Sequence, residues 1–264
     1  MNALAFDNGS YRTPPARPGL LAGAFPGVWF YTSLGMIILR SSRLAMRGAY
    51  DTPAWCASSV ETLRALEATG VRVEIRGVEN FSALEGPCVL VGNHMSTLET
   101  LVLPSIVLPF KELTFVVKES LLNHPAMKHI MRARNLIVVG RENPREDLKA
   151  VLEGGEARIA AGICVAVFPQ TTRTAVFDPA AFSSIGVKLA RRANVPVVPL
   201  ALKTDAWGNG RRLKDLGRID PSKTVRFEFG KPLRVGGRGA EEQREIVEFI
   251  AGRLKEWGGT VVNA

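Results

Sequence analysis

One histidine and one glutamate stand at a spacing that could serve acid–base chemistry. His94 follows the apolar run of residues 89–91 and Gly92, and Glu99 comes five residues later. On one continuous helix, five residues correspond to about 140° of rotation, so the two side chains would not share a face. They can meet if His94 lies in a turn and Glu99 lies in the first turn of the helix that follows.

The residues between them support this boundary. Ser96, followed three positions later by Glu99, forms a capping box, which predicts Ser96 as the N-cap of a helix. A carboxylate held there can accept a hydrogen bond from one imidazole nitrogen and leave the other free to take a proton. The pattern therefore predicts a general base with an orienting partner. The structural alternative is an ordinary turn histidine beside a helix cap.

Other predicted strands end in residues that could bind an anion. The apolar run 165–168 stops at Pro169, and a polar turn follows, made of Gln170, Thr171, Thr172 and Arg173. Backbone N–H groups, hydroxyls and a guanidinium in one turn can hold an anionic group. Two further apolar runs lead to Lys118 and Arg141. For each of these cations, a solvated surface charge is the alternative interpretation.

Taken together, these blocks resemble the motifs of the 1-acylglycerol-3-phosphate (lysophosphatidic acid) acyltransferases and the wider glycerolipid acyltransferase family. Asn93-His94-x-Ser96-x-x-Glu99 resembles the family's Asn-His-x-Ser-x-x-Asp motif. The stretch from Phe168 to Arg173 is similar to its Phe-Pro-Glu-Gly-Thr-Arg motif. Val139-Gly140-Arg141 and Val195-Pro196-Val197-Val198-Pro199 resemble two more. The resemblance covers roughly residues 70–235.

The resemblance implies roles for individual residues. His94 and Glu99 would be catalytic. Lys118, Arg141 and Arg173 would hold the phosphate of the acceptor. Further substrate contacts would come from the remaining motif positions Asn93, Ser96, Gln170, Thr171 and Thr172. Two departures from the family pattern matter: Glu99 replaces aspartate, and Gln170-Thr171 replaces Glu-Gly, which removes a charge on the acceptor side.

The implied reaction moves a fatty acyl group from acyl-CoA or acyl-carrier protein to the free hydroxyl of a lysophospholipid. The expected acceptor is 1-acylglycerol-3-phosphate, which would become phosphatidic acid in phospholipid biosynthesis. No cofactor or metal is expected. Two alternatives remain: an acyltransferase for another lysolipid or lyso-aminolipid, and a non-catalytic lipid-binding relative.

The elements that must position these residues follow from the periodicity. Residues 71–76 alternate strictly between apolar and polar, which predicts a half-buried strand. From there, short apolar runs alternate with helical patterns as far as a closing helix over 240–257. This order predicts an α/β fold in which helices flank a mixed, largely parallel sheet. We expect residues 1–69 to form an N-terminal region and residues 70–264 the acyltransferase domain.

The N-terminal region is predicted to begin with a loose tail over residues 1–18. Residues 19–39 then contain no charged residue, and as one helix they would be about 31 Å long, enough to span a bilayer core. Such a helix could span the membrane, lie in one leaflet or pack in the core. Membrane insertion is our preferred interpretation, because the resemblance implies a hydrophobic element that seats the enzyme on the membrane. Arginines after the run favour a cytoplasmic catalytic part on the inner membrane.

Charge and cysteine content agree with this interpretation. The formal net charge of +9 favours anionic partners, here an anionic membrane surface and phosphorylated lipids. The basic residues are dispersed, so a nucleic-acid partner is not indicated. Three cysteines, an odd number, predict free thiols in a reducing compartment.

Overall fold

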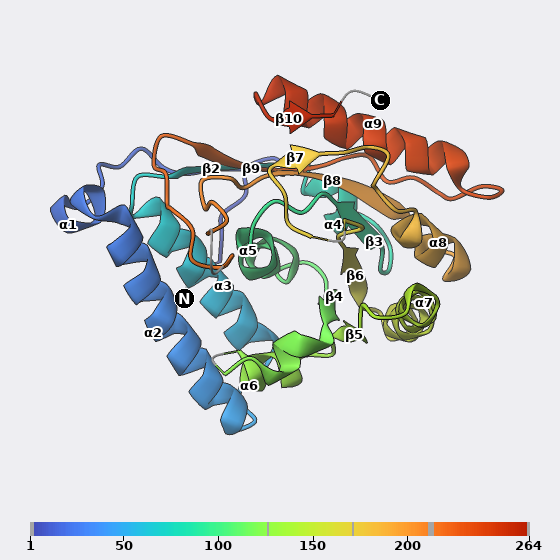
Figure 1. The fold of residues 1–264 in the computed structure, drawn as a ribbon, viewed down its shortest axis with the longest axis horizontal. Helices are drawn as coiled ribbons and strands as arrows, with labels where there is room; N and C mark the ends of the chain where they lie inside the picture. The colour runs from blue at the N-terminus through green and yellow to red at the C-terminus, as the bar shows by residue number, and fades with distance from the viewer. Residues whose placement is uncertain (1–2, 126, 171, 211–213, 263–264) are drawn as a thin grey trace.

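The computed structural model describes residues 3–125, 127–170, 172–210 and 214–262 (Figure 1). Within them, one eight-stranded sheet has the order β1-β2-β9-β8-β3-β6-β4-β5. Its strands are β1 Tyr11–Arg12, β2 Arg72–Arg76, β3 Val89–Gly92, β4 Leu113–Lys118, β5 Ile137–Val139, β6 Cys164–Val167, β8 Val197–Lys203 and β9 Thr224–Phe229. A separate parallel pair consists of β7 (Val176–Phe177) and β10 (Thr260–Val261).

The five strands from β8 to β5 run parallel to one another. At the other side of the sheet, β9 is antiparallel to β8, β2 is parallel to β9, and β1 is antiparallel to β2. The predicted α/β fold with a mixed, mostly parallel sheet is therefore confirmed. Because carboxyl ends of parallel strands meet at one edge, the residues that follow β3, β4, β5 and β6 gather there.

Helices cover both faces of the sheet (Figure 1). One face packs against α2 (Pro26–Met46), α3 (Thr52–Glu67) and α5 (Leu98–Val107), and the other against α7 (Pro144–Ala160), α8 (Ile185–Arg192) and α9 (Ala240–Glu256). Shorter helical segments are α1 (Leu20–Ala24), α4 (Glu79–Ser82), a 3₁₀ helix (Glu119–Asn123) and α6 (Lys128–Arg132). The strand alternation explains the two layers: in β3, Leu90 belongs to the first core, whereas Val89 and Val91 belong to the second.

The apolar run of residues 19–39 does not form the single helix we predicted. It is divided between α1 and α2 at Pro26, which lacks a backbone N–H and therefore begins a new helix. One face of α2 is buried through Phe30, Leu34 and Ile37, and the first two of these residues join the core cluster of the sheet. Among the described residues, no helix combines the length and apolar character needed to cross a membrane.

The prediction of a loose tail over residues 1–18 is wrong. Tyr11 pairs with Ile75 of β2, and its hydroxyl donates a hydrogen bond of 2.6 Å to Glu67 on α3. A two-residue strand is too short to leave a periodic signal, so the sequence pattern could not reveal it. Because Leu4 and Tyr11 lie in the same core cluster as the sheet, this segment packs on the fold. The boundary we placed after residue 69 stays a prediction.

Candidate active site

The turn after β3 is fixed to the neighbouring strand by Asn93. Its amide nitrogen donates to the carbonyl of Leu202, and its amide oxygen accepts the N–H of Leu202, both at 2.8 Å. Gly92 just before it allows a close approach of the two strands, because a Cβ there would lie 3.0 Å from the carbonyl oxygen of Leu200. We expected Asn93 to contact substrate, but both ends of its buried amide bind the backbone of β8.

Glu99 is fully buried and organises the backbone around the turn. Its Oε1 accepts the N–H groups of Met95 at 2.5 Å and Ser96 at 2.9 Å, and its Oε2 accepts the Ser96 hydroxyl at 3.0 Å. The Ser96 oxygen accepts the N–H of Leu98 at 3.1 Å. The predicted N-cap is one residue too early: α5 begins at Leu98 with Thr97 as its N-cap, and the Ser96 oxygen binds the N–H of the first helical residue. Ser96 serves the helix start, which differs from the substrate contact we expected.

The imidazole of His94 faces this carboxylate. Its Nδ1 lies 3.6 Å from Glu99 Oε1, beyond hydrogen-bond distance, and is buried without a hydrogen-bond partner among the described residues. Burial raises the pKa of Glu99, but its interactions with His94 and with the N–H of Ser96 outweigh that effect and hold the pKa below its ordinary value. Glu99 is therefore ionised at neutral pH and can stabilise a positive charge on His94.

The end of β6 holds the other side of His94. The Phe168 ring stacks on the imidazole with centroids 4.8 Å apart and planes 11° from parallel. The backbone N–H of His94 donates to Gln170 Oε1 at 2.6 Å, and the backbone N–H of Thr174 donates to the backbone carbonyl of His94 at 3.0 Å. Gln170 thus positions the base through its backbone, whereas we expected it to contact substrate. The stacking partner was missed, although its place at a strand end inside a motif was a usable signal.

The three predicted cations lie at different distances from the base. Lys118 ends β4 and Arg141 follows β5, and both are exposed. Neighbouring strands are spaced about 4.8 Å apart, which places β4 about 10 Å and β5 about 14 Å from β3. Arg173 is much closer, since its guanidinium donates to Thr97 Oγ1, three residues after His94. Its side chain is only 18% exposed.

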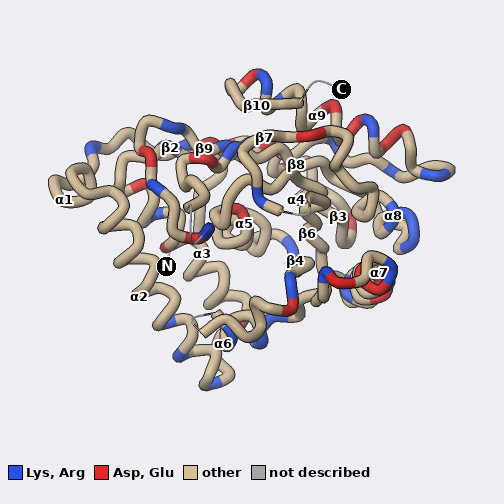
Figure 2. The backbone as a smooth tube through the Cα atoms, viewed as in Figure 1, with Lys and Arg blue, Asp and Glu red and all other residues tan. Residues whose placement is uncertain are grey.

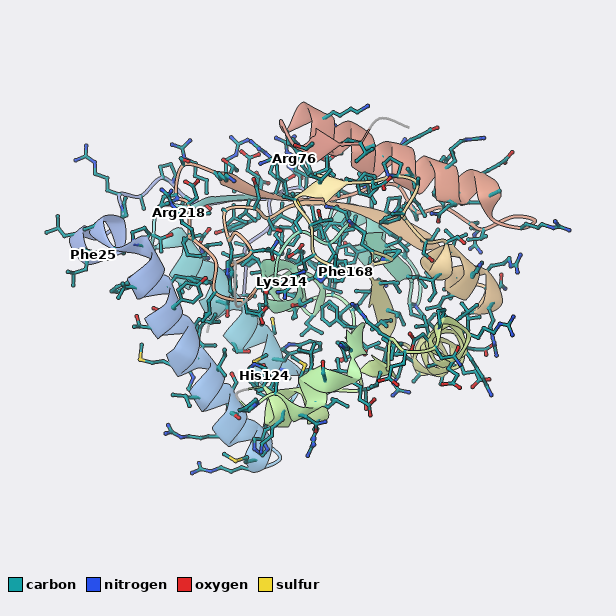
Figure 3. The ribbon with its side chains drawn as sticks, viewed as in Figure 1. Phe25, Arg76, His124, Phe168, Lys214 and Arg218 are labelled. Atoms are coloured by element: carbon teal, nitrogen blue, oxygen red, sulfur yellow. The ribbon has the colours of Figure 1, made fainter. Side chains whose placement is uncertain are left out.

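The loop over residues 206–220 contributes Lys214 and Asp215 to this part of the site. The Asp215 carboxylate forms an ion pair with Arg173 and accepts the Thr97 hydroxyl at 2.7 Å. The Lys214 ammonium donates to Thr172 Oγ1 at 2.8 Å. Burial raises the pKa of Asp215, but the hydrogen bonds from Arg173 and Thr97 and the nearby positive charges lower it below its ordinary range. Figure 3 shows Lys214 and Phe168 in the same central region of the view. Thr171 lies outside the described residues.

Comparisons with known proteins agree with this geometry. The profile of the acyltransferase family matches residues 72–203, half of the chain. A 1-acyl-sn-glycerol-3-phosphate acyltransferase of Pseudomonas aeruginosa is 32% identical over 227 residues, which cover 86% of this chain and 83% of that protein. The human 1-acyl-sn-glycerol-3-phosphate acyltransferase alpha is 28% identical over 139 residues, or 51% of this chain and 47% of the human protein.

A solved structure shows the same fold. The crystal structure of the 1-acyl-sn-glycerophosphate (LPA) acyltransferase from Thermotoga maritima superimposes with a TM-score of 0.64 at 19% sequence identity. The match covers 89% of this chain and 96% of the other. The family profile, the Pseudomonas relative and the arrangement around His94 lead to one conclusion: the chain belongs to the acyltransferase family that includes the 1-acyl-sn-glycerol-3-phosphate acyltransferases.

Proposed function

We propose that the protein transfers a fatty acyl group from a thioester donor, acyl-CoA or acyl-carrier protein, to the free hydroxyl of 1-acylglycerol-3-phosphate. The product is phosphatidic acid, an intermediate of phospholipid synthesis. The observation that carries this proposal is the pair of His94 and ionised Glu99 at the carboxyl edge of the parallel strands. The activity for which the Pseudomonas and human relatives are named supports it.

The reaction is a direct transfer in this proposal. His94 takes the proton from the acceptor hydroxyl while the oxygen attacks the thioester carbonyl. The carbon–sulfur bond then breaks, and the leaving thiolate takes the proton from His94. Glu99 stabilises the imidazolium in between. An acyl-enzyme is not needed, because a thiolate is already a good leaving group, and the steps use neither a metal nor a cofactor.

Arg173 is the first ligand we propose for the acceptor phosphate, because it lies beside Thr97 in the turn that carries His94. Thr172 would add a hydroxyl, and Lys118 and Arg141 would reach the phosphate from β4 and β5. Holding the phosphate places the acceptor hydroxyl near the base, and such positioning can be worth several kcal/mol, about 7 or more in favourable cases.

The test measures thiol release from a long-chain acyl-CoA. We expect release that depends on 1-acylglycerol-3-phosphate, with phosphatidic acid as the product. Release with another lysolipid or a lyso-aminolipid instead would overturn the proposed acceptor. The choice of acceptor needs this test because neutral Gln170 stands where the family pattern has glutamate. The same assay with acyl-carrier protein identifies the donor. Saturable lipid binding without thiol release from either donor would show a non-catalytic binding protein.

We further propose that α1 and α2 seat the protein on an anionic membrane. Large apolar side chains on these helices and at the residue between them are exposed: Leu20, Leu21, Phe25, Val28, Trp29, Met36, Leu39 and Met46. Figure 3 shows Phe25 pointing away from the body of the molecule. In Figure 2, α1 and most of α2 lack charge, and Lys or Arg residues gather at the carboxyl end of α2. A helix with these features lies in the plane of one leaflet.

This seating makes a measurable prediction. A variant with Leu21→Glu and Phe25→Glu should lose binding to vesicles that contain phosphatidylglycerol, because both exposed apolar side chains would carry charge into the interface. Vesicle flotation measures the loss. Val176→Glu, a charge added at an exposed apolar position on β7, serves as the control and should float like the unchanged protein. Equal flotation of all three proteins would contradict the seating. The cytoplasmic face stays a prediction.

A further inference from the structure

The loop over residues 206–220 has a defined backbone in its described part. Its two arms are joined by hydrogen bonds from the Asp220 N–H to the Ala206 carbonyl at 2.8 Å and from the Gly208 N–H to the Arg218 carbonyl at 3.0 Å. The two arms of the loop are therefore paired by backbone hydrogen bonds, and this pairing limits how far the backbone near Asp215 can move.

The loop is also fixed to α2. The Trp207 side chain is buried and meets the Phe30 ring edge-on, with centroids 4.9 Å apart. The Tyr31 hydroxyl donates to the carbonyl oxygen of Gly217. The first contact fixes the arm that begins at Ala206, and the second fixes the arm that carries Lys214 and Asp215. The loop thus keeps its position above the strand ends.

Asp215 binds the groups that an acceptor phosphate would need. Its carboxylate oxygen accepts from the Thr97 hydroxyl at 2.7 Å and from the Arg173 guanidinium. A phosphate oxygen would use the same donors, since both groups are anionic oxygen acceptors of charge-assisted hydrogen bonds. The Asp215 carboxylate therefore occupies the donors that the acceptor phosphate would use.

We propose that Asp215 determines acceptor specificity by competing with the acceptor phosphate for Arg173 and Thr97. The phosphate of an acceptor must displace the Asp215 carboxylate from Arg173 and Thr97 before the acceptor hydroxyl can reach His94. This proposal rests on the function proposed above, and it names a residue that selects the headgroup.

Charge gives the exchange its direction. A phosphate monoester carries about −1.5 to −2 charges at neutral pH, against one on Asp215, so it is the stronger partner for the guanidinium. The Asp215 side chain is 56% exposed, so rotation can bring its carboxylate into water while the loop backbone stays in place. A headgroup without net negative charge has no advantage over Asp215 and is rejected.

The decisive variant is Asp215→Asn, which keeps the size and one acceptor oxygen but removes the charge. Exposed ion pairs are weak, so we expect the KM for 1-acylglycerol-3-phosphate to fall about two- to fivefold, with the change in KM rather than in kcat. Asp220→Asn is the matched control, because it removes the same charge from the same loop while its side chain contacts Ser222 instead of Arg173. The control should leave KM unchanged.

Three outcomes would overturn the proposal. An increase in KM for Asp215→Asn would show that Asp215 orients Arg173 for the phosphate, and an unchanged KM would show that the two do not compete. In a protein that carries Arg173→Ala, the addition of Asp215→Asn should lower KM by less than Asp215→Asn does alone, because only the Thr97 hydroxyl is then left to compete for. An equally large decrease in both backgrounds would contradict competition at Arg173.

Calorimetry with glycerol 3-phosphate separates this inference from the proposed function. It reports occupancy of the phosphate site without acyl transfer, and Asp215→Asn should bind this probe about two- to fivefold more tightly than the unchanged protein. Tighter binding together with an absence of thiol release would refute the function and keep the inference. Thiol release together with equal or weaker binding would do the reverse.

Discussion

Replacement of His94 by alanine is expected to lower the rate of acyl transfer by about 10²- to 10⁴-fold, the usual contribution of a positioned general base. Its Nδ1 faces ionised Glu99 at 3.6 Å, and its ring is held against Phe168. Without the imidazole, the acceptor hydroxyl must lose its proton to water. Thiol release with saturating acyl-CoA and 1-acylglycerol-3-phosphate measures the loss of rate, and we expect kcat to be the parameter that decreases.

A second histidine provides the control for this experiment. His129 lies on α6, outside the motif, and His129→Ala should keep more than half of the activity. Both variants should have the circular dichroism spectrum of the unchanged protein. For His94→Ala the reason is that Nδ1 of the imidazole has no hydrogen-bond partner among the described residues, so its removal breaks no such bond. A folded His94→Ala protein with activity within tenfold of the unchanged enzyme would refute the assignment of the base.

The sequence predicted the central fold because each element there has a strong local signal. The apolar runs that became β3, β4, β5, β6 and β8 end at polar or proline-marked turns, and the intervening helices carry recognisable starts. For example, Asn143 accepts the N–H of Arg145 at 3.1 Å ahead of Pro144, which begins α7. The N-terminal region had weaker signals: a two-residue strand has no periodicity, and an uncharged run does not reveal which of its faces is buried.

The same reasoning explains the site. His94 and Arg173 follow the ends of β3 and β6, and Glu99 lies in the first turn of the helix after β3. Parallel strands bring such ends to one edge, so the assembly of the three residues could be predicted. Asn93 and Gln170 instead bind backbone groups of the protein, because the turn needs partners for its own polar groups. Asp215 could not be foreseen, since its contact with Arg173 joins residues 42 positions apart through a loop without a motif.

Glu99→Gln tests the orienting carboxylate and should have the second largest effect. A unit charge at about 4 Å contributes up to about 4 kcal/mol at an effective dielectric constant near 20, which sets an upper bound of about 10³ on the loss in kcat. We expect about a 10²-fold loss, less than for His94→Ala, because the imidazole can still take a proton without its counter-charge. Glu99→Asp should lose less, since it keeps the charge.

The same substitution changes how stability depends on pH. The pKa of Glu99 in the folded protein lies below its ordinary value of 4.5, so the ionised carboxylate stabilises the fold above pH 4.5. This contribution decreases as the pH falls from 4.5 through the folded-state pKa, whereas Glu99→Gln has no charge to lose. Urea unfolding at pH 7, 5.5 and 4 should therefore show a constant stability advantage of the unchanged protein at the two higher values and a smaller one at pH 4. Glu153→Gln, at an exposed position on α7, is the control for the loss of a carboxylate elsewhere in the protein. An advantage of the unchanged protein over Glu99→Gln that grows towards pH 4 would show that folding raises the pKa of Glu99, which contradicts the stabilised carboxylate described here.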